Sequence, residues 1–299
     1  MRKSNKYIGL LLPLIHLSLM GGSLVEVQAQ SGWTKGKDEA FFKLSYIHFS
    51  SDEYHNLSGE SMTTATYRQQ QVGVYGEYGV TERLTLLMDW PLLKWQGFES
   101  TETVLGTGDI RIGAKYALVK KIPISLTIMP ELPIAQANKY ARNDNPAFGS
   151  INLPTGDGEF NVYSTLAVST SLYPLPGYVN FFSTYNFRTS YESVQLTDQM
   201  MEGLEVGYQP VGALWLKAGL KLQQTLNDSE TAVSFVRGEG TEFTSYYLGA
   251  YYSATESWGV DFTFINYLDG PQQSRNIYQG PIFSLGLVYE TSGLFSGND

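Results

Sequence analysis

The feature that most constrains the fold is an alternation of apolar and polar side chains, repeated along most of the chain between Lys43 and Tyr289. In the segment from Ala213 to Leu222, one face consists of Leu214, Leu216, Ala218, Leu220 and Leu222, and the other of Trp215, Lys217, Gly219 and Lys221. A period of two residues is that of a β-strand. The stretches run for roughly ten to fourteen residues; about nine to eleven tilted residues cross a bilayer, whereas about five or six suffice for a soluble sandwich. The sequence therefore predicts an all-β protein, and a transmembrane β-barrel in particular.

The alternating stretches predict twelve antiparallel strands in a single barrel. They lie near residues 40–49, 66–79, 83–94, 108–118, 123–135, 159–172, 178–191, 200–210, 213–225, 242–253, 257–268 and 280–290. Short connections at 80–82, 120–122, 174–177, 210–212 and 254–256 alternate with long polar ones at 50–65, 95–107, 136–158, 192–199, 226–241 and 269–279. This alternation is typical of outer-membrane barrels, which have short periplasmic turns and long extracellular loops. An even number of strands places both termini in the periplasm.

The first residues have the features of a cleaved secretory signal. A basic start precedes the mostly apolar run 7–20, and Val27-Gln28-Ala29 offers small residues before a cleavage site at Gln30. The apolar run has about fourteen residues, fewer than the roughly twenty that a helical membrane span needs. The expected organisation is a signal peptide at 1–29, a short periplasmic segment at 30–39, the barrel at 40–290 and a tail at 291–299. The residues from Gln30 to Asp38 are too few for a plug domain.

Composition and charge narrow the compartment and the partners. The chain contains no cysteine, so neither a disulfide nor a lipid-bearing cysteine is available. The formal net charge of −9 becomes −11 when the three basic residues of the signal and Glu26 are removed, which argues against nucleic acid as a partner. The 21 tyrosines suit the interfacial girdles of a barrel in a Gram-negative outer membrane. Expected partners there are membrane lipid, lipopolysaccharide, the barrel-assembly machinery and a small solute.

One face of the predicted strands is free of charge and would contact lipid. It contains Phe42, Leu44, Tyr46, Val72, Val74, Leu84, Leu86, Met88, Trp90, Ile110, Ile112, Ala114, Tyr116, Ile124, Leu126, Ile128, Val162, Leu166, Val168, Leu204, Val206, Tyr208, Leu248, Ala250, Tyr252, Val260, Phe262, Phe264, Phe283, Leu285 and Leu287. A Lys or Arg that faces lipid at mid-depth costs about 2–4 kcal/mol, so an uncharged face is expected of a membrane barrel. The strand near 178–191 is the least clear, because both of its faces carry aromatic residues.

The opposite faces carry charged residues that would point into the barrel. They are Lys43, Glu77, Asp89, Asp109, Arg111, Lys115, Glu131, Arg188, Glu205, Lys217, Lys221 and Asp261. Buried charges must be paired, and an arginine can bridge two carboxylates. The register that preserves the faces puts Asp89 opposite Arg111 and Glu131 on its other side. We therefore predict an Asp89–Arg111–Glu131 cluster, with Asp109 and Lys115 near it. Two roles remain open: fixing the register and filling the lumen, or setting a constriction or polar track for a solute.

Inward aromatic residues suggest a route for an apolar solute. Those predicted to line the lumen are Tyr75, Tyr163, Phe182, Trp215, Tyr247 and Tyr251, and they would act by stacking and desolvation. The loop 136–158 is the most apolar of the long loops and is a candidate lid, with Pro146, Phe148, Ile151 and Leu153 as its covering residues. The alternatives are that the aromatic residues fill the lumen and that the loop residues only pack on the rim.

The residues give little support to catalysis or metal binding. A barrel lipase needs a serine nucleophile with a histidine base at the rim. Beyond the signal, the sequence has two histidines, His48 and His55, and the order His-Asn-Leu-Ser-Gly from His55 does not match the His-x-Ser-Asn-Gly pattern of outer-membrane phospholipase. The segment 143–145 and the pair Asp157 and Glu159 carry oxygen ligands suited to Ca²⁺, but acidic loop residues are commonly solvated. We predict no enzyme activity, no cofactor and no metal.

Three stretches together resemble a known family. They are the hairpin 75–84 (Tyr-Gly-Glu-Tyr-Gly-Val-Thr-Glu-Arg-Leu), the strand start 106–116 (Gly-Thr-Gly-Asp-Ile-Arg-Ile-Gly-Ala-Lys-Tyr) and the segment 153–157 (Leu-Pro-Thr-Gly-Asp). This combination resembles the outer-membrane family named for the meta-pathway of phenol degradation. The resemblance covers about residues 66–170 and implies a barrel channel for aromatic or other hydrophobic compounds, distantly related to the fatty-acid transporter barrels.

The expected function is therefore transport. The lumen of a twelve-stranded barrel is wider than that of a filled eight-stranded barrel and narrower than that of a porin of sixteen or more strands. This favours an outer-membrane channel or transporter for a small solute, with hydrophobic or aromatic compounds as the first candidates. The alternatives are a structural or adhesive barrel with a filled lumen, and a lipid hydrolase with an active site at the rim.

Overall fold

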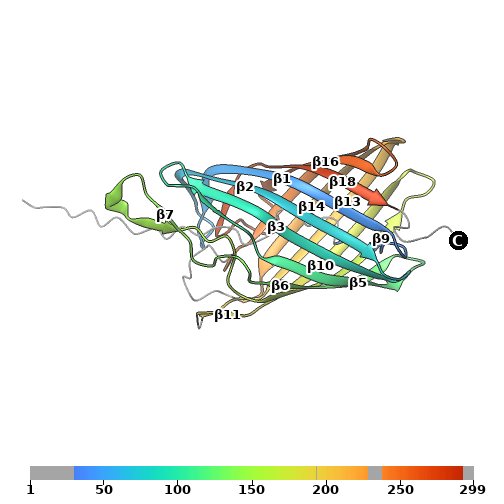
Figure 1. Cartoon of the computed structure of the whole chain (residues 1–299), viewed down its shortest axis with the longest axis horizontal. Coiled ribbons are helices and arrows are strands. Elements are labelled where there is room, and N and C mark those ends of the chain that lie inside the picture. Colours follow the sequence, from blue (N-terminus) through green and yellow to red (C-terminus); the bar gives the residue numbers. More distant parts are fainter. Residues whose placement is uncertain (1–29, 193, 228–237, 292–299) are drawn as a thin grey trace, which may run out of the picture.

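The computed structural model describes residues 30–192, 194–227 and 238–291. The predicted signal peptide at 1–29 and nearly all of the predicted tail lie outside the described residues. Within the described residues no helix is long and apolar enough to cross a membrane. The chain is a closed antiparallel barrel of twelve long strands, so the predicted all-β class, the single closed barrel and the number of strands are confirmed. Figure 1 shows the strands tilted around one barrel, with the last strand, β18, ending on the side away from β7.

The twelve long strands follow the predicted stretches closely. They are β1 (Ala40–His55), β2 (Ser61–Gly79), β3 (Leu84–Phe98), β5 (Ile110–Val119), β6 (Ile124–Leu132), β9 (Asn161–Ser171), β10 (Gly177–Arg188), β13 (Gln199–Val211), β14 (Leu214–Thr225), β15 (Phe243–Ser253), β16 (Trp258–Leu268) and β18 (Ile282–Thr291). Each pairs with its neighbour along the chain, and β1 closes the ring by pairing with β18 from Ala40 opposite Thr291 to Phe49 opposite Ile282. Closure leaves no unpaired sheet edge.

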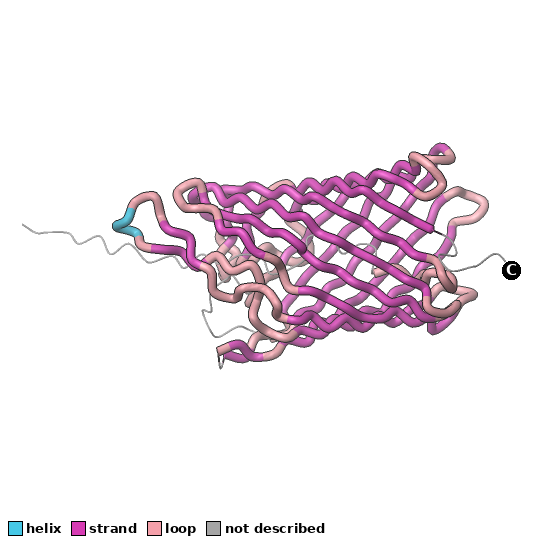
Figure 2. Tube along the Cα trace, in the orientation of Figure 1, coloured by secondary structure: helices cyan, strands magenta, loops and turns pink. Residues whose placement is uncertain are grey.

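Shorter elements lie at one end of the barrel, which we call the loop end. They are β4 (Val104–Gly106), β7 (Tyr140–Arg142), the 3₁₀ turn η1 (Pro146–Phe148), β8 (Ser150–Asn152), β11 (Ser190–Tyr191), β12 (Val194–Gln195) and β17 (Ile277–Gln279). The hairpin of β7 and β8, with η1 at its tip, projects away from the barrel (Figure 2). The other end, which we call the turn end, carries the short connections between strands.

The first long loop was predicted with the wrong length. Residues 50–65 were expected to be a long polar loop, but β1 and β2 continue as a paired hairpin through Glu53 opposite Thr63 and His55 opposite Ser61. A bulge between Ser51 and Glu53 accommodates the change. The polar composition misled the sequence analysis, because backbone pairing continues beyond the apolar belt wherever a partner strand lies alongside. The connecting segment is then 56–60.

Lumen-facing glycines make room for large side chains from the adjacent strand. A Cβ on Gly203 would lie 2.3 Å from the ring of Phe182, and one on Gly219 would lie 2.2 Å from the ring of Tyr247. Each glycine is the direct cross-strand partner of that aromatic residue. The barrel therefore packs its interior by pairing a residue without a side chain with one whose ring lies flat over the neighbouring strand, a known device for glycines in sheets.

The outward face is an apolar belt. Leucine and isoleucine side chains on six strands (Leu44, Ile112, Leu166, Leu204, Leu248 and Leu285) are between 43% and 55% exposed. The neighbouring positions on the same strands point inward and are buried or half-buried. A contiguous exposed apolar surface of this kind marks contact with a membrane or a partner. The pattern is that of a chain whose inside is polar and whose outside is apolar.

This belt generates a prediction about Leu285. Replacing Leu285 with Arg is expected to lower the free energy of unfolding from lipid vesicles by about 2–4 kcal/mol, because a charge would face hydrocarbon. The control is Leu57→Arg in the 56–60 connection, where Leu57 is also exposed and a surface substitution changes stability by about 0.5 kcal/mol or less. Urea unfolding of both variants measures the difference. Equal, small losses would show that the belt does not contact lipid.

Candidate functional site

The strongest candidate for a functional site is the lumen, where charged side chains from many strands are buried. Arg111 on β5 lies between Asp89 on β3 and Glu131 on β6, with each carboxylate residue as its direct cross-strand partner. Arg111 Nε donates to Glu131 Oε2 at 2.6 Å, and Arg111 Nη1 lies 3.8 Å from Asp89 Oδ2. The guanidinium also lies over the ring of Tyr163, 4.3 Å from its centroid. The register therefore brings together the three residues that the sequence analysis grouped.

Lys115 does not join this cluster, contrary to the prediction. Its Nζ lies 3.5 Å from Glu77 Oε1 and donates to the carbonyl oxygen of Trp33 at 3.3 Å, nearer the turn end. The reason is strand geometry: four residues along a strand amount to about 13 Å. Asp109 lies beside the cluster but accepts hydrogen bonds from the backbone N–H groups of Ala135 and Asp157, each at 2.9 Å. Asp109 therefore ties the loop after β6 to the mouth.

A second centre lies closer to the turn end. The carboxylate of Asp261 on β16 is shared by two ammonium groups, from Lys43 on β1 and Lys217 on β14. Lys217 Nζ donates to Asp261 Oδ2 at 2.8 Å, and Lys43 Nζ donates to Oδ1. Asp261 is fully buried. One carboxylate thus holds together strands that are not neighbours in the barrel.

A third centre, at the loop end, includes residues that the sequence analysis missed. Arg188 on β10 donates from Nε to Glu159 Oε1 at 2.9 Å, and its Nη1 lies 3.3 Å from Glu239 Oε2. Glu159, which begins the predicted strand 159–172, and Glu239 both lie outside the strands that the structure forms, so strand pairing does not set their direction. Lys94 on β3 was also missed, because the β2–β3 register shifts at Val72 and Val74 and reverses the inward phase.

Three of the six aromatic residues predicted to line the lumen, Tyr75, Tyr163 and Tyr247, contact charged groups. Tyr247 donates to Glu205 Oε2 at 2.8 Å, Tyr178 donates to Glu205 Oε1 at 2.7 Å, and Tyr75 donates to Glu77. Tyr163 contacts Arg111 as described, Phe182 is buried over Gly203, and Trp215 lies 5.7 Å from Tyr178 between ring centroids, while Tyr251 covers Gly259. The rings therefore alternate with polar groups and do not form a continuous apolar track.

One apolar cluster lies inside the barrel. We call it the lumen cluster; it contains Phe41, Tyr75, Leu87, Met129, Tyr163, Met201 and Val288. These residues come from β1, β2, β3, β6, β9, β13 and β18. Strands β2 and β13 are six positions apart in either direction around the ring, so they form opposite walls. The lumen cluster therefore includes side chains from opposite walls of the barrel.

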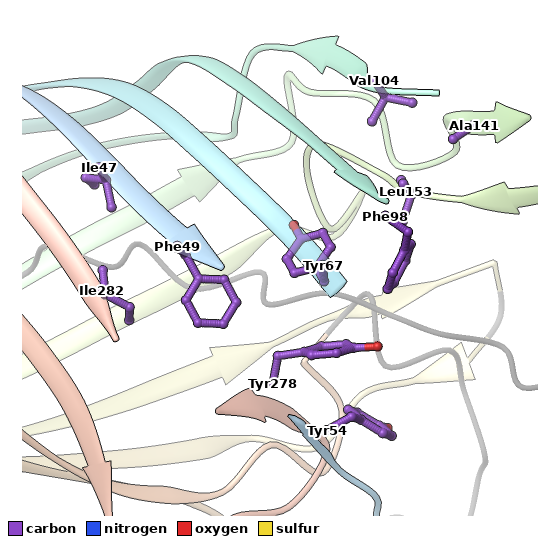
Figure 3. Close-up of a cluster of buried hydrophobic side chains, with 10 residues drawn as sticks. All are labelled: Ile47, Phe49, Tyr54, Tyr67, Phe98, Val104, Ala141, Leu153, Tyr278 and Ile282. Atoms are coloured by element: carbon purple, nitrogen blue, oxygen red, sulfur yellow. The ribbon is translucent and has the colours of Figure 1, made fainter. Parts of the chain in front are cut away.

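The candidate lid divides into two parts. Leu153 is fully buried in a cluster at the loop end that includes Phe98, Tyr67 and Tyr278 (Figure 3). Ile151 packs against this cluster. Pro146 and Phe148 form the projecting tip η1, and Phe148 is 64% exposed. Only the base of the loop covers the barrel, because the hairpin of β7 and β8 carries the tip outward.

The segment before β1 also contributes to the lumen. Residues 30–38, expected to be a short periplasmic segment, run inside the turn end, where Gln30 and Gly32 are buried.

Among the described residues there is no group of three or more His, Cys, Asp or Glu side chains able to hold a metal ion. His55 instead lies 3.2 Å from Glu53, and Asn145 caps η1 through Ala147 N–H.

The Asp261 centre generates a prediction. Asp261→Ala leaves two buried ammonium groups without their shared carboxylate, and removing one partner of a buried ion pair costs about 3–5 kcal/mol. We expect a loss of that size in the free energy of unfolding, measured by urea titration in detergent or lipid. Glu256→Ala, in an exposed turn, is the control. Replacing Lys43, Lys217 and Asp261 together by apolar residues of similar size should recover most of the loss; an unchanged single variant would contradict the charge pairing.

Comparison with known proteins places the fold. No protein-family model matches the chain, and no curated protein matches it. An outer-membrane channel from Pseudomonas putida F1 aligns over 89% of this chain and 100% of that chain, with a TM-score of 0.64 and 15% identity. The translocator domain of the autotransporter NalP from Neisseria meningitidis aligns over 85% and 89%, with a TM-score of 0.51 and 11% identity. The Pseudomonas putida toluene transporter TodX gives a TM-score of 0.42, too low to carry an argument. The chain thus has the β-barrel fold of these outer-membrane structures.

Proposed function

We propose that this protein is a passive outer-membrane channel for small solutes. The observation that carries the proposal is the polar inner wall inside an apolar outer belt. Buried charged or hydroxyl groups occur from the Asp261 centre near the turn end to the Arg188 centre at the loop end. A barrel that served only as a scaffold could fill its interior with apolar side chains, which avoids the desolvation of buried ions. In this proposal the outer-membrane lipid and lipopolysaccharide surround the belt, and the barrel-assembly machinery inserts it.

The lining favours polar solutes, in particular those that carry a positive group. At the loop end Glu159 Oε2, Asn161 Oδ1 and Asn186 Oδ1 are buried, and no hydrogen-bond partner for them lies among the described residues. All three are acceptors that ring Arg188: Asn161 is its cross-strand partner, and Asn186 is two residues earlier on the same face. Unpaired buried acceptors are costly unless a donor, a water or a cation reaches them.

The electrostatics of the loop end support the same solute class. Burial raises the pKa of Asp157 well above its usual value, and the nearby carboxylates of Glu131 and Glu159 raise it further. Burial likewise raises the pKa of Glu159 to about 7, against the lowering effect of Arg188. A positive charge that enters among carboxylates crowded in this way stabilises their charged form. A cationic or zwitterionic solute would supply that charge.

Hydrophobic or aromatic solutes are the second candidate. The lumen cluster favours hydrophobic or aromatic solutes, since an apolar solute could pass between its side chains without losing hydrogen bonds. Osmotic swelling of vesicles that contain the purified barrel decides between the two. Sugars and amino acids should enter faster than neutral aromatic compounds of similar size if the polar wall governs passage, and the order should reverse if the cluster governs it. If none of the tested solutes causes the vesicles to swell, the protein is a structural barrel with a filled lumen.

Arg111 provides a test of the lumen charge. Arg111→Ala leaves Asp89 and Glu131 unbalanced and adds negative charge to the lumen. Because one unit charge at about 4 Å contributes about 1 kcal/mol in water, the preference for potassium over chloride should rise roughly five-fold. Reversal potentials across planar bilayers measure it. Arg68→Ala, which removes an exposed arginine from β2, should have no effect; an unchanged Arg111→Ala channel would leave Arg111 with a structural role alone.

Glu159 provides a test by pH. Its pKa of about 7 means that the carboxyl is mostly neutral below this pH and charged above it. Cation preference should therefore rise as pH increases from about 6 to about 8. Glu159→Gln should flatten this rise, whereas Glu192→Gln, at an exposed position between β11 and β12, should retain it. A rise of equal size in all three proteins would assign the titration to another group.

A further inference from the structure

The segment from Gln30 to Asp38 follows the inner rim of the turn end past six strands. Nearest to β1, Asp38 N–H donates to the carbonyl oxygen of Gly79 at the end of β2 at 2.8 Å. Lys35 N–H donates to Thr85 Oγ1 on β3 at 3.0 Å, and Lys115 Nζ on β5 donates to the carbonyl oxygen of Trp33 at 3.3 Å. The segment therefore does not leave the barrel where β1 begins.

The same path continues to the opposite wall. Ser125 Oγ on β6 donates to the carbonyl oxygen of Ser31 at 2.9 Å, and Gly32 N–H donates to Ser169 Oγ on β9 at 2.8 Å. Asn180 Nδ2 on β10 donates to the carbonyl oxygen of Gln30 at 3.0 Å. Strand β10 is six positions from β1 in the ring, so the segment connects opposite sides of the mouth. The Trp33 ring, 5.5 Å from the Tyr178 ring between centroids, spans part of the same opening.

Close packing fixes the segment at two glycines. A Cβ on Gly32 would lie 2.2 Å from the carbonyl oxygen of Pro123 and 2.8 Å from the backbone nitrogen of Ser169. At the other end, a Cβ on Gly79 would lie 1.8 Å from the carbonyl oxygen of Gly36. Both obstacles are backbone atoms, which cannot turn aside as a flexible side chain can. Glycine at position 32 is therefore a requirement of the seated segment.

We propose that residues 30–38 form a strap that gates the turn-end mouth. The proposal rests on the proposed channel function and concerns its regulation. From Lys37 back to Gln30, hydrogen bonds between the strap and the wall join backbone groups of the strap to side chains of the wall, and residues 30–38 belong to no strand. Water replaces such bonds one at a time, so the strap can leave the rim without unpairing any barrel strand. Passage of solute requires that displacement.

Gly32→Val is the first test. The added side chain cannot fit against Pro123, so the strap should leave the rim while the wall keeps all its residues. We expect the single-channel conductance, and the swelling rate with a small sugar, to increase severalfold. Gly212→Val is the matched control, because a Cβ on Gly212 has nothing within 4 Å, and it should behave like the native chain. Equal conductance in the native chain and in Gly32→Val would overturn the gate.

A reversible lock is the second test and does not depend on how Gly32→Val folds. The chain has no cysteine, so Ser31→Cys combined with Ser125→Cys introduces a single pair, bridged by oxidation or by a short thiol cross-linker. The bridged protein should have the lowest conductance, and reduction of a disulfide bridge should restore it; each single variant is insensitive to both treatments. Failure to form the bridge overturns the position of the strap.

The two experiments separate the two proposals. If the pair bridges and conductance is the same before and after reduction, the strap is seated but is not a gate, and the channel function stands. If the pair bridges and neither native nor variant barrels conduct any ion or admit any solute, the channel function itself fails and the strap is a structural closure. A gated channel requires both the bridge and a conductance that follows it.

Discussion

Pairing of buried charges between strands is the interaction on which the interior of this barrel depends. Each of three centres uses one charged group to hold two opposite ones: Arg111 with Asp89 and Glu131, Asp261 with Lys43 and Lys217, and Arg188 with Glu159 and Glu239. A slip of one residue in any of these strands would turn its charges toward the apolar belt and its belt residues inward. The charge pairs and the apolar belt therefore specify the same strand register, and each of them raises the free energy of a register shifted by one residue.

The lumen is filled by contrast in side-chain size as well as by charge. Glycines beneath Phe182 and Tyr247 let these rings lie against the wall, while the lumen cluster adds apolar side chains from opposite walls. The Asp261 centre lies at the same depth as part of this cluster, because Lys43 is the cross-strand partner of both Tyr75 and Val288. In the proposed channel, a solute that enters at the loop end would meet the acceptor groups around Arg188 first and would then reach a section where apolar side chains and the Asp261 centre lie together. Selection by charge and restriction by size thus act together near the turn end.

Much of this arrangement follows from local sequence, and the exceptions have physical causes. The period-two pattern predicts which way Arg111 and Glu131 point, and antiparallel pairing then brings them together. It fails at Lys94, because a register shift between β2 and β3 reverses the phase. It does not fix the direction of Glu159 or Glu239, which lie outside the strands that the structure forms. For the same reason the pattern could not separate the two parts of the candidate lid, since only packing in three dimensions decides that Leu153 is buried and Phe148 exposed.

The strap shows why counting residues alone was misleading. The segment from Gln30 to Asp38 is too short for a folded plug, and the sequence analysis therefore considered only the loop 136–158 as a candidate lid. An extended chain advances about 3.3 Å per residue, so nine residues reach roughly 30 Å. Neighbouring strands lie about 4.8 Å apart, so the six steps from β1 to β10 amount to about 29 Å. A segment of this length therefore reaches the opposite wall along the rim without forming any structure of its own. The wall supplies the hydrogen-bonding groups, and the segment needs only a small residue where it passes Pro123.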